Sequence, residues 1–192
     1  TYLMVKKGRF EAGILRANAY GGSAKGRLLA TTTPGGIDVK LVAALDKVNL
    51  GQAGAYLSQT ARLSGTGGLQ LSLDGLGRSL PEVLASLSGK ASLALRQGEL
   101  GGFAFGELLR RAERNPGLAL RDWRQGRTAF ETASANAVIA NGILTLGDAQ
   151  MAGSGYRLTL AGTAALPTQT LDMAMLLQPL TGALRLPFSL TG

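Results

Sequence analysis

The chain has 192 residues, of which 45% are hydrophobic, and a formal net charge of +8 at pH 7. It contains no cysteine and no histidine, which excludes disulfides, thiol nucleophiles, cysteine–histidine zinc sites and the usual imidazole base. Aromatic residues make up only 5% of the chain, too few for a surface that stacks nucleobases or sugars.

The first third of the chain has the composition of β-strands joined by glycine turns. Apolar residues alternate irregularly at first, because Ile14 and Leu15 are adjacent, and then alternate cleanly from Ile37 to Leu41. Asn49 is expected to cap a short helix that ends near Ser58. Strands are expected over 8–19, 26–32 and 37–41, with turns at 20–22 and 34–36.

A short phrase then occurs twice, in which leucines alternate with polar residues between two glycines. It reads Gly68-Leu69-Gln70-Leu71-Ser72-Leu73-Asp74-Gly75 and, later, Gly155-Tyr156-Arg157-Leu158-Thr159-Leu160-Ala161-Gly162. Side chains alternate across a strand, so the leucines share one face and the polar residues the other. Such strands predict a sheet with one apolar and one wetted side. What covers the apolar side is therefore the functional question.

Two helices are predicted between the strands. The sequence Ser79-Leu80-Pro81-Glu82 is a capping box with proline in the first turn, and it begins a helix that ends before Gly89. A second helix is expected over 103–114, where Asn115-Pro116-Gly117 ends it. A third helical turn is expected over 118–125.

The remaining residues alternate as strands with short connections. A turn is expected at Gln97-Gly98, and Asn141-Gly142 is a strong hairpin signal. Connections this short cannot form parallel crossovers. The prediction is an α+β, mainly β fold of roughly ten strands: a curved, twisted, mostly antiparallel sheet that forms an open groove, with two or three short helices. Residues 1–62 and 63–192 are expected to be two sections of this groove, within what could be one continuous sheet.

Two or three short helices can cover about half of a ten-strand face, since a helix is about 10 Å wide and strands lie about 4.8 Å apart. The rest of the apolar face packs on itself, on a partner or on lipid, and the residues leave these alternatives open. The candidates to line a lipid groove are the aliphatic side chains Leu69, Leu71, Leu73, Leu93, Leu95, Leu144, Leu146, Leu158, Leu160, Met173 and Met175.

Arginines crowd the stretch from 110 to 127. Such a cluster is commonly a solvated helix face, and its functional interpretation is attraction of phospholipid head groups or of an acidic partner. No nucleic-acid-binding motif accompanies it, so nucleic acid is not an expected partner. The head-group or partner-facing candidates are Arg110, Arg111, Arg114, Arg121, Arg124 and Arg127.

Catalytic patterns are weak throughout the chain. Glu107 and Glu113 lie six residues apart on the expected helix and do not face each other. The glycines from Gly65 to Gly68 lack the lysine and the following helix of a phosphate loop. Ser154 has no histidine partner. We therefore expect neither an enzyme nor a cofactor or metal site.

The run from Gly75 to Gly89, followed by Leu93 to Leu100, resembles the C-terminal region of the AsmA family. The later features Phe130, 139–144, 153–155, Gly162, Leu171-Asp172 and Gln178-Pro179 follow in the same order. The resemblance covers about 63–192, and the first third is similar more loosely, through Tyr20-Gly21-Gly22 and Gly26.

The resemblance implies a Gram-negative periplasmic protein held in the inner membrane by a helix absent from this segment. The family is similar to bridge-like, chorein-type lipid transfer proteins, which implies phospholipid transport for outer-membrane biogenesis, with phospholipid acyl chains in the groove and an envelope or membrane protein as a further partner. The competing hypothesis is a non-enzymatic scaffold, whose core is closed by its helices and whose basic surface binds a protein.

Overall fold

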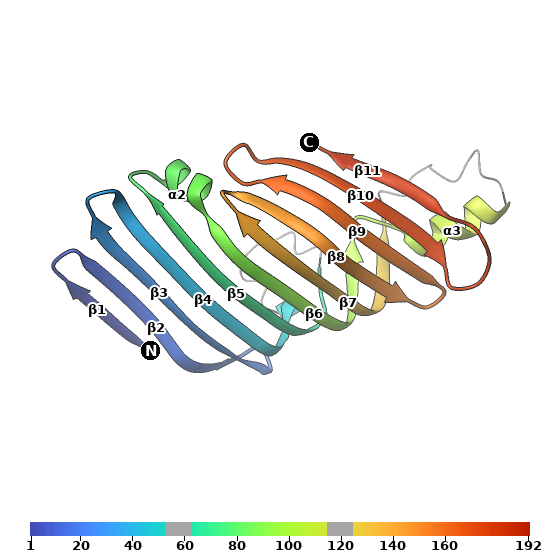
Figure 1. Ribbon diagram of the computed structural model, residues 1–192. Coiled ribbons are helices and arrows are strands. Elements are labelled where there is room, and N and C mark those ends of the chain that lie inside the picture. Colours follow the sequence, from blue (N-terminus) through green and yellow to red (C-terminus); the bar gives the residue numbers. More distant parts are fainter. Residues whose placement is uncertain (53–62, 115–124) are drawn as a thin grey trace.

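The computed structural model describes residues 1–52, 63–114 and 125–192. Strands in these residues form one antiparallel sheet in which every strand pairs with its neighbours in chain order (Figure 1). The sheet is curved and is not closed into a barrel, because β1 and β11 remain its two edges. The strands are β1 (Tyr2–Lys6), β2 (Arg9–Ala19), β3 (Gly22–Thr33), β4 (Gly36–Asn49), β5 (Thr66–Gly77), β6 (Ser88–Gly101), β7 (Arg127–Ala140), β8 (Ile143–Gly153), β9 (Tyr156–Ala165), β10 (Thr170–Pro179) and β11 (Leu186–Thr191).

The turns explain why the strands follow one another as a meander. Asn141 and Gly142 have φ values of 50° and 73°, the left-handed conformation that a two-residue hairpin requires and that asparagine and glycine tolerate best. The predicted hairpin between β7 and β8 is therefore confirmed. β4 and β5 also pair directly, so the sheet runs on across the boundary expected at residue 62.

Three β-bulges keep the apolar side chains on one face. The register shifts between Ile14 and Ala17 in β2, between Leu45 and Val48 in β4, and between Leu146 and Ala149 in β8. In each bulge the two intervening residues are exposed. A bulge inserts an extra residue and resets the alternation, which is why Ile14 and Ala17, three residues apart, point to the same face.

A cluster of polar groups ties the first three strands together. The carboxylate of Glu11 in β2 accepts hydrogen bonds from Tyr2 Oη at 2.8 Å, from Arg9 at 2.9 Å and from Arg27 at 2.9 Å. Glu11 is buried, and these partners, Arg9 first, hold the pKa of its carboxyl below the usual range. The cluster fixes β1, an edge strand, to β2 and β3.

Helix α2 (Leu80–Ser86) lies at one end of the strands, over β5, on the face of the sheet that carries the alternating leucines. Glycines permit this close packing, because a Cβ atom on Gly77 would lie 2.5 Å from the Val83 nitrogen. The predicted capping box is present: Ser79 Oγ accepts the Glu82 amide at 3.4 Å, and Glu82 Oε2 accepts the Arg78 amide at 2.9 Å.

Replacing Ser79 by alanine removes one of these two capping bonds. We expect Ser79→Ala to lower the free energy of unfolding by about 1 kcal/mol. The Ser79 side chain is exposed at the start of α2, so we expect the substitution to leave lipid uptake unchanged. Chemical denaturation of both forms measures the difference. An unchanged midpoint would show that the Glu82 bond alone holds this helix end.

Helix α3 (Phe105–Arg114) lies at the opposite end of the strands from α2 (Figure 1). Thr128 Oγ1 accepts the Phe105 amide at 2.9 Å and donates to the Phe103 carbonyl at 2.7 Å, which attaches the start of the helix to β7. Below the helix lies the buried core of the molecule, formed by Leu95, Phe105, Leu108, Leu109, Ala112, Phe130, Met151, Tyr156, Leu158, Met175 and Leu177.

The structure differs from the sequence expectations in a few places. Gln97-Gly98 is not a turn: Gln97 has a φ of 50° but lies inside β6, which runs on to Gly101. Alternation predicts a strand over 143–146, whereas β8 extends to Gly153, past the bulge that interrupts its alternation. The Asn49 cap is present, with Asn49 Oδ1 accepting the Gln52 amide at 3.0 Å. The rest of that predicted helix, and nearly all of the turn predicted over 118–125, lie outside the described residues.

Candidate functional site

All eleven aliphatic candidates lie on one face of the sheet. Residues paired across antiparallel strands point to the same side, and the register links Leu69 to Leu93, and Met151 of β8 to Leu158. The remaining pairs, followed from strand to strand, show that all eleven side chains are on the same side of the sheet. Leu41 and Leu45 of β4 lie on this side as well. We call this side, from β1 to β11, the apolar face.

Helix α3 closes part of the apolar face. Leu95, Leu158 and Met175 are buried there, and Leu177 of β10, which sequence reasoning did not single out, is 0% exposed. The other eight candidates are partly exposed: Leu69, Leu71, Leu73, Leu93, Leu144, Leu146, Leu160 and Met173.

Tyr156 closes the edge of this core. Its hydroxyl donates to the Ala129 carbonyl at 2.9 Å, and its ring lies 6.5 Å from that of Phe105. Burial, and then the nearby Glu131 carboxylate, raise the pKa of Tyr156 to about 12. The side chain therefore stays neutral at physiological pH, as its position in an apolar core requires.

Among the described residues the apolar face is largely open over β1 to β5, where α2 covers one end of β5. Val48 is the one buried hydrophobic side chain of the described residues in these strands. Leu41, Leu45, Leu69 and the neighbours in their rows are partly exposed, and at the β1 edge Leu3 and Val5 are 67% and 72% exposed. The chain thus displays a row of aliphatic side chains that continues from the closed core to an open edge.

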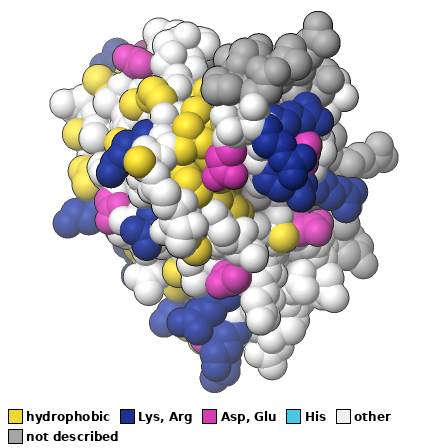
Figure 2. Space-filling view, turned by 90° about the vertical axis from the view of Figure 1, so that its right-hand side faces the viewer, with side chains coloured by type: hydrophobic (Ala, Val, Ile, Leu, Met, Phe, Trp, Pro, Cys, Tyr) yellow, Lys and Arg dark blue, Asp and Glu magenta, His cyan; other side chains and the backbone are white. Residues whose placement is uncertain are grey.

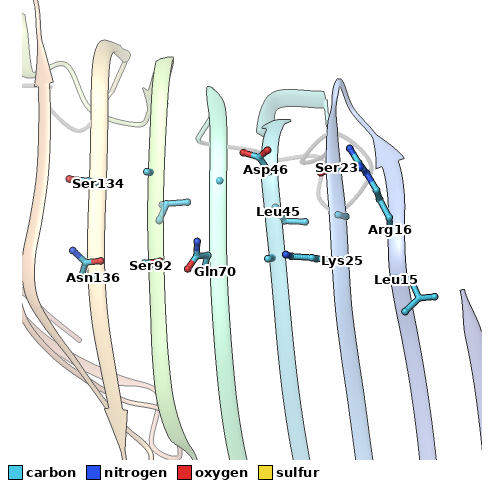
Figure 3. Close-up of a pocket in the computed structure, with 15 residues that line it drawn as sticks. Leu15, Arg16, Ser23, Lys25, Leu45, Asp46, Gln70, Ser92, Ser134 and Asn136 are labelled. Atoms are coloured by element: carbon cyan, nitrogen blue, oxygen red, sulfur yellow. The ribbon is translucent and has the colours of Figure 1, made fainter.

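The opposite face is polar and carries a hollow of about 770 Å³. Gln70, Ser92 and Asn136 are directly paired on β5, β6 and β7 and line it together with Lys25 and Arg16 (Figure 3). Sequence reasoning placed polar side chains on this face but gave no sign of the hollow, which lies where the bulges of β2 and β4 come together.

The arginine cluster is divided among different surroundings. Arg110 and Arg111 both pair with Glu107 on the exposed side of α3, and these bonds, that of Arg111 first, lower the pKa of the Glu107 carboxyl. Arg127 of β7 lies 3.6 Å from Glu99, and Arg114 is exposed at the helix end. Arg121 and Arg124 lie outside the described residues.

Seen from the β11 side, hydrophobic side chains form a strip in the middle of the molecule, with lysine and arginine side chains on both sides of it (Figure 2). Leu186 and Phe188 of β11 pack against the buried core and belong to the apolar face. Acidic side chains lie among the basic ones on both sides of this strip (Figure 2).

The described residues form no helix that has both the length and the hydrophobicity needed to cross a membrane. Searches of curated proteins and of solved structures found no match. The model of the AsmA family matches residues 1–149, which include the first third of the chain, where the resemblance in sequence is looser. The match extends from the open edge of the apolar face through most of β8, and on this basis the chain belongs to the AsmA family.

Proposed function

We propose that this segment shields the acyl chains of phospholipids on its apolar face, as part of a periplasmic protein anchored in the inner membrane of a Gram-negative bacterium. Its role would be phospholipid transport for outer-membrane biogenesis. The observation that carries the proposal is the open part of the apolar face: from β1 to β5, the described aliphatic side chains other than Val48 remain partly or fully exposed.

The energetics favour an acyl chain as the cover for this surface. Removing a methylene from water stabilises by about 0.8 kcal/mol, so a 16-carbon chain exposed to water costs on the order of 12 kcal/mol. Leucine and methionine side chains make no directional bonds, so a bound chain can slide along them. Shielding on this face is passive and requires no catalytic residue, while head groups lie outside the apolar face.

A closed interaction scaffold is the second candidate, and α3 favours it. The helix buries Leu95, Leu158 and Leu177, so that end of the apolar face has no room for lipid unless the helix moves. In that case the basic surface would bind a protein of the membrane or envelope, and the chain would carry no lipid.

Native mass spectrometry of the expressed segment after mild extraction distinguishes these functions. We expect co-purified phospholipid, and we expect a fluorescent fatty-acid probe to bind and to be displaced by added phospholipid. A lipid-free spectrum, together with no uptake of the probe, would exclude acyl shielding and leave the scaffold. The spectrum also identifies the bound lipid by its mass.

A further inference from the structure

A second hollow, of about 720 Å³, lies between α3 and the adjoining ends of β7, β9 and β10. Its volume is within the range of about 300–1,000 Å³ typical of small-molecule sites. The chain segments that form this hollow come from distant parts of the sequence, so no local sequence pattern predicts it. It differs from the hollow on the polar face because it borders the buried core.

The floor of this hollow is apolar. Leu109 and Phe130 line it and are buried in the core, and Tyr156 lines it beside them. The same three side chains contribute to the core beneath α3 on the apolar face. A molecule in the hollow would therefore touch the closed end of that face.

The rim of the hollow carries both signs of charge. Arg110 and Arg127 line it, and their ion pairs are solvent-exposed, that of Arg127 with Glu99 being 3.6 Å long. Three carboxylates also line it: Glu107, which pairs with Arg110, and Glu113 and Glu131, neither of which forms an ion pair with a described residue. The hollow therefore offers two cations that can exchange their exposed partners and, beside Glu107, two carboxylates that have no ion-pair partner among the described residues.

We propose that this hollow binds the zwitterionic head group of a phospholipid that carries a primary amine beside its phosphate, as in an ethanolamine head group. This inference rests on the proposed function and names the lipid class. Arg110 and Arg127 would bind the phosphate, since exposed guanidinium groups form charge-assisted bonds to phosphate oxygens. Glu113 and Glu131 would bind the ammonium.

Glu113 and Glu131 would give the hollow its selectivity among phospholipid head groups. A primary ammonium donates three hydrogen bonds and can bond directly to a carboxylate of the hollow, whereas a trimethylated ammonium donates none. A head group with phosphate and hydroxyls alone brings no positive charge to Glu113 and Glu131. The order of affinity expected is therefore ethanolamine above choline and above glycerol.

The test uses head-group compounds without acyl chains, so that it does not depend on the apolar face. Glycerophosphoethanolamine, glycerophosphocholine and glycerophosphoglycerol are titrated against the isotope-labelled chain and followed by NMR. We expect glycerophosphoethanolamine to bind most tightly and to shift the amides of Thr128 and Gly155. Glu131→Gln should weaken its binding by about tenfold and abolish the preference over choline, while Arg127→Gln should weaken all three compounds.

Matched controls come from exposed charges elsewhere on the sheet. Asp172→Asn on β10 and Arg157→Gln on β9 remove one charge of the same sign each, and both should leave the three affinities unchanged. Equal affinities for the three compounds, or a preference that survives Glu131→Gln, would overturn the inference.

The two proposals can fail separately. Uptake of the fatty-acid probe without any head-group preference would leave acyl shielding in place and remove the head-group site. A preference for glycerophosphoethanolamine without probe uptake would remove acyl shielding, and with it the assignment of the hollow to a lipid.

Discussion

Leu158→Asp is expected to unfold the C-terminal half of the sheet. From the sequence alone two outcomes are conceivable: loss of lipid uptake if Leu158 lines an open groove, or unfolding if it lies in a closed core. The structure favours unfolding, because Leu158 lies in the closed core: it is 7% exposed and pairs with Met151 and Leu177 beneath α3. An unpaired carboxylate there should lower the free energy of unfolding by about 4 kcal/mol or more.

Circular dichroism during urea denaturation measures this loss of stability. Val138→Asp is the matched control, because Val138 lies in the same half of the sheet, on the polar face, and is 53% exposed. That variant should unfold at a urea concentration close to that of the parent chain. A stable Leu158→Asp protein would mean that α3 does not close this end of the apolar face in solution.

Leu71→Asp is expected to have the opposite effect, with loss of lipid uptake in a chain that still folds. Leu71 lies in the middle of β5 on the apolar face, is partly exposed, and pairs with Ala43 and Ala91, whose side chains are small. A carboxylate there stays hydrated, so we expect a loss of stability of about 1 kcal/mol. Placed in the path of an acyl chain, the same charge should reduce probe binding at least tenfold.

Fluorescence titration with the fatty-acid probe measures this change. Ser72→Asp is the control, because Ser72 is the next residue of β5 and points to the polar face, so its variant should bind the probe like the parent chain. Unchanged uptake by Leu71→Asp would show that acyl chains do not cross β5, and would move the proposed shielding elsewhere.

Local rules of the sequence predicted much of this protein. Alternation of leucine with polar residues placed Leu69, Leu71 and Leu73 on one side of β5, and the capping box at Ser79 and the hairpin turn at Asn141-Gly142 lie where they were predicted. These features depend on backbone geometry within a few residues, which the side chains nearby specify. An open antiparallel sheet with one apolar face follows from them.

Bulges and the burial of individual leucines could not be predicted this way. Leu93 and Leu95 are equivalent by alternation, yet Leu95 is buried under α3 whereas Leu93 is partly exposed. The position of a helix over a sheet depends on packing between segments that are distant in the chain. The convergence of Arg110 with Arg127 and Glu131 around one hollow has the same origin.

The sequence by itself therefore determined that the chain forms an apolar sheet face, because period-two alternation is a property of each strand alone. Only the tertiary structure decided where that face is closed and where it is open. That division arises because α3 buries its four apolar side chains against one end of the sheet, and the stability gained there depends on contacts that no single strand encodes.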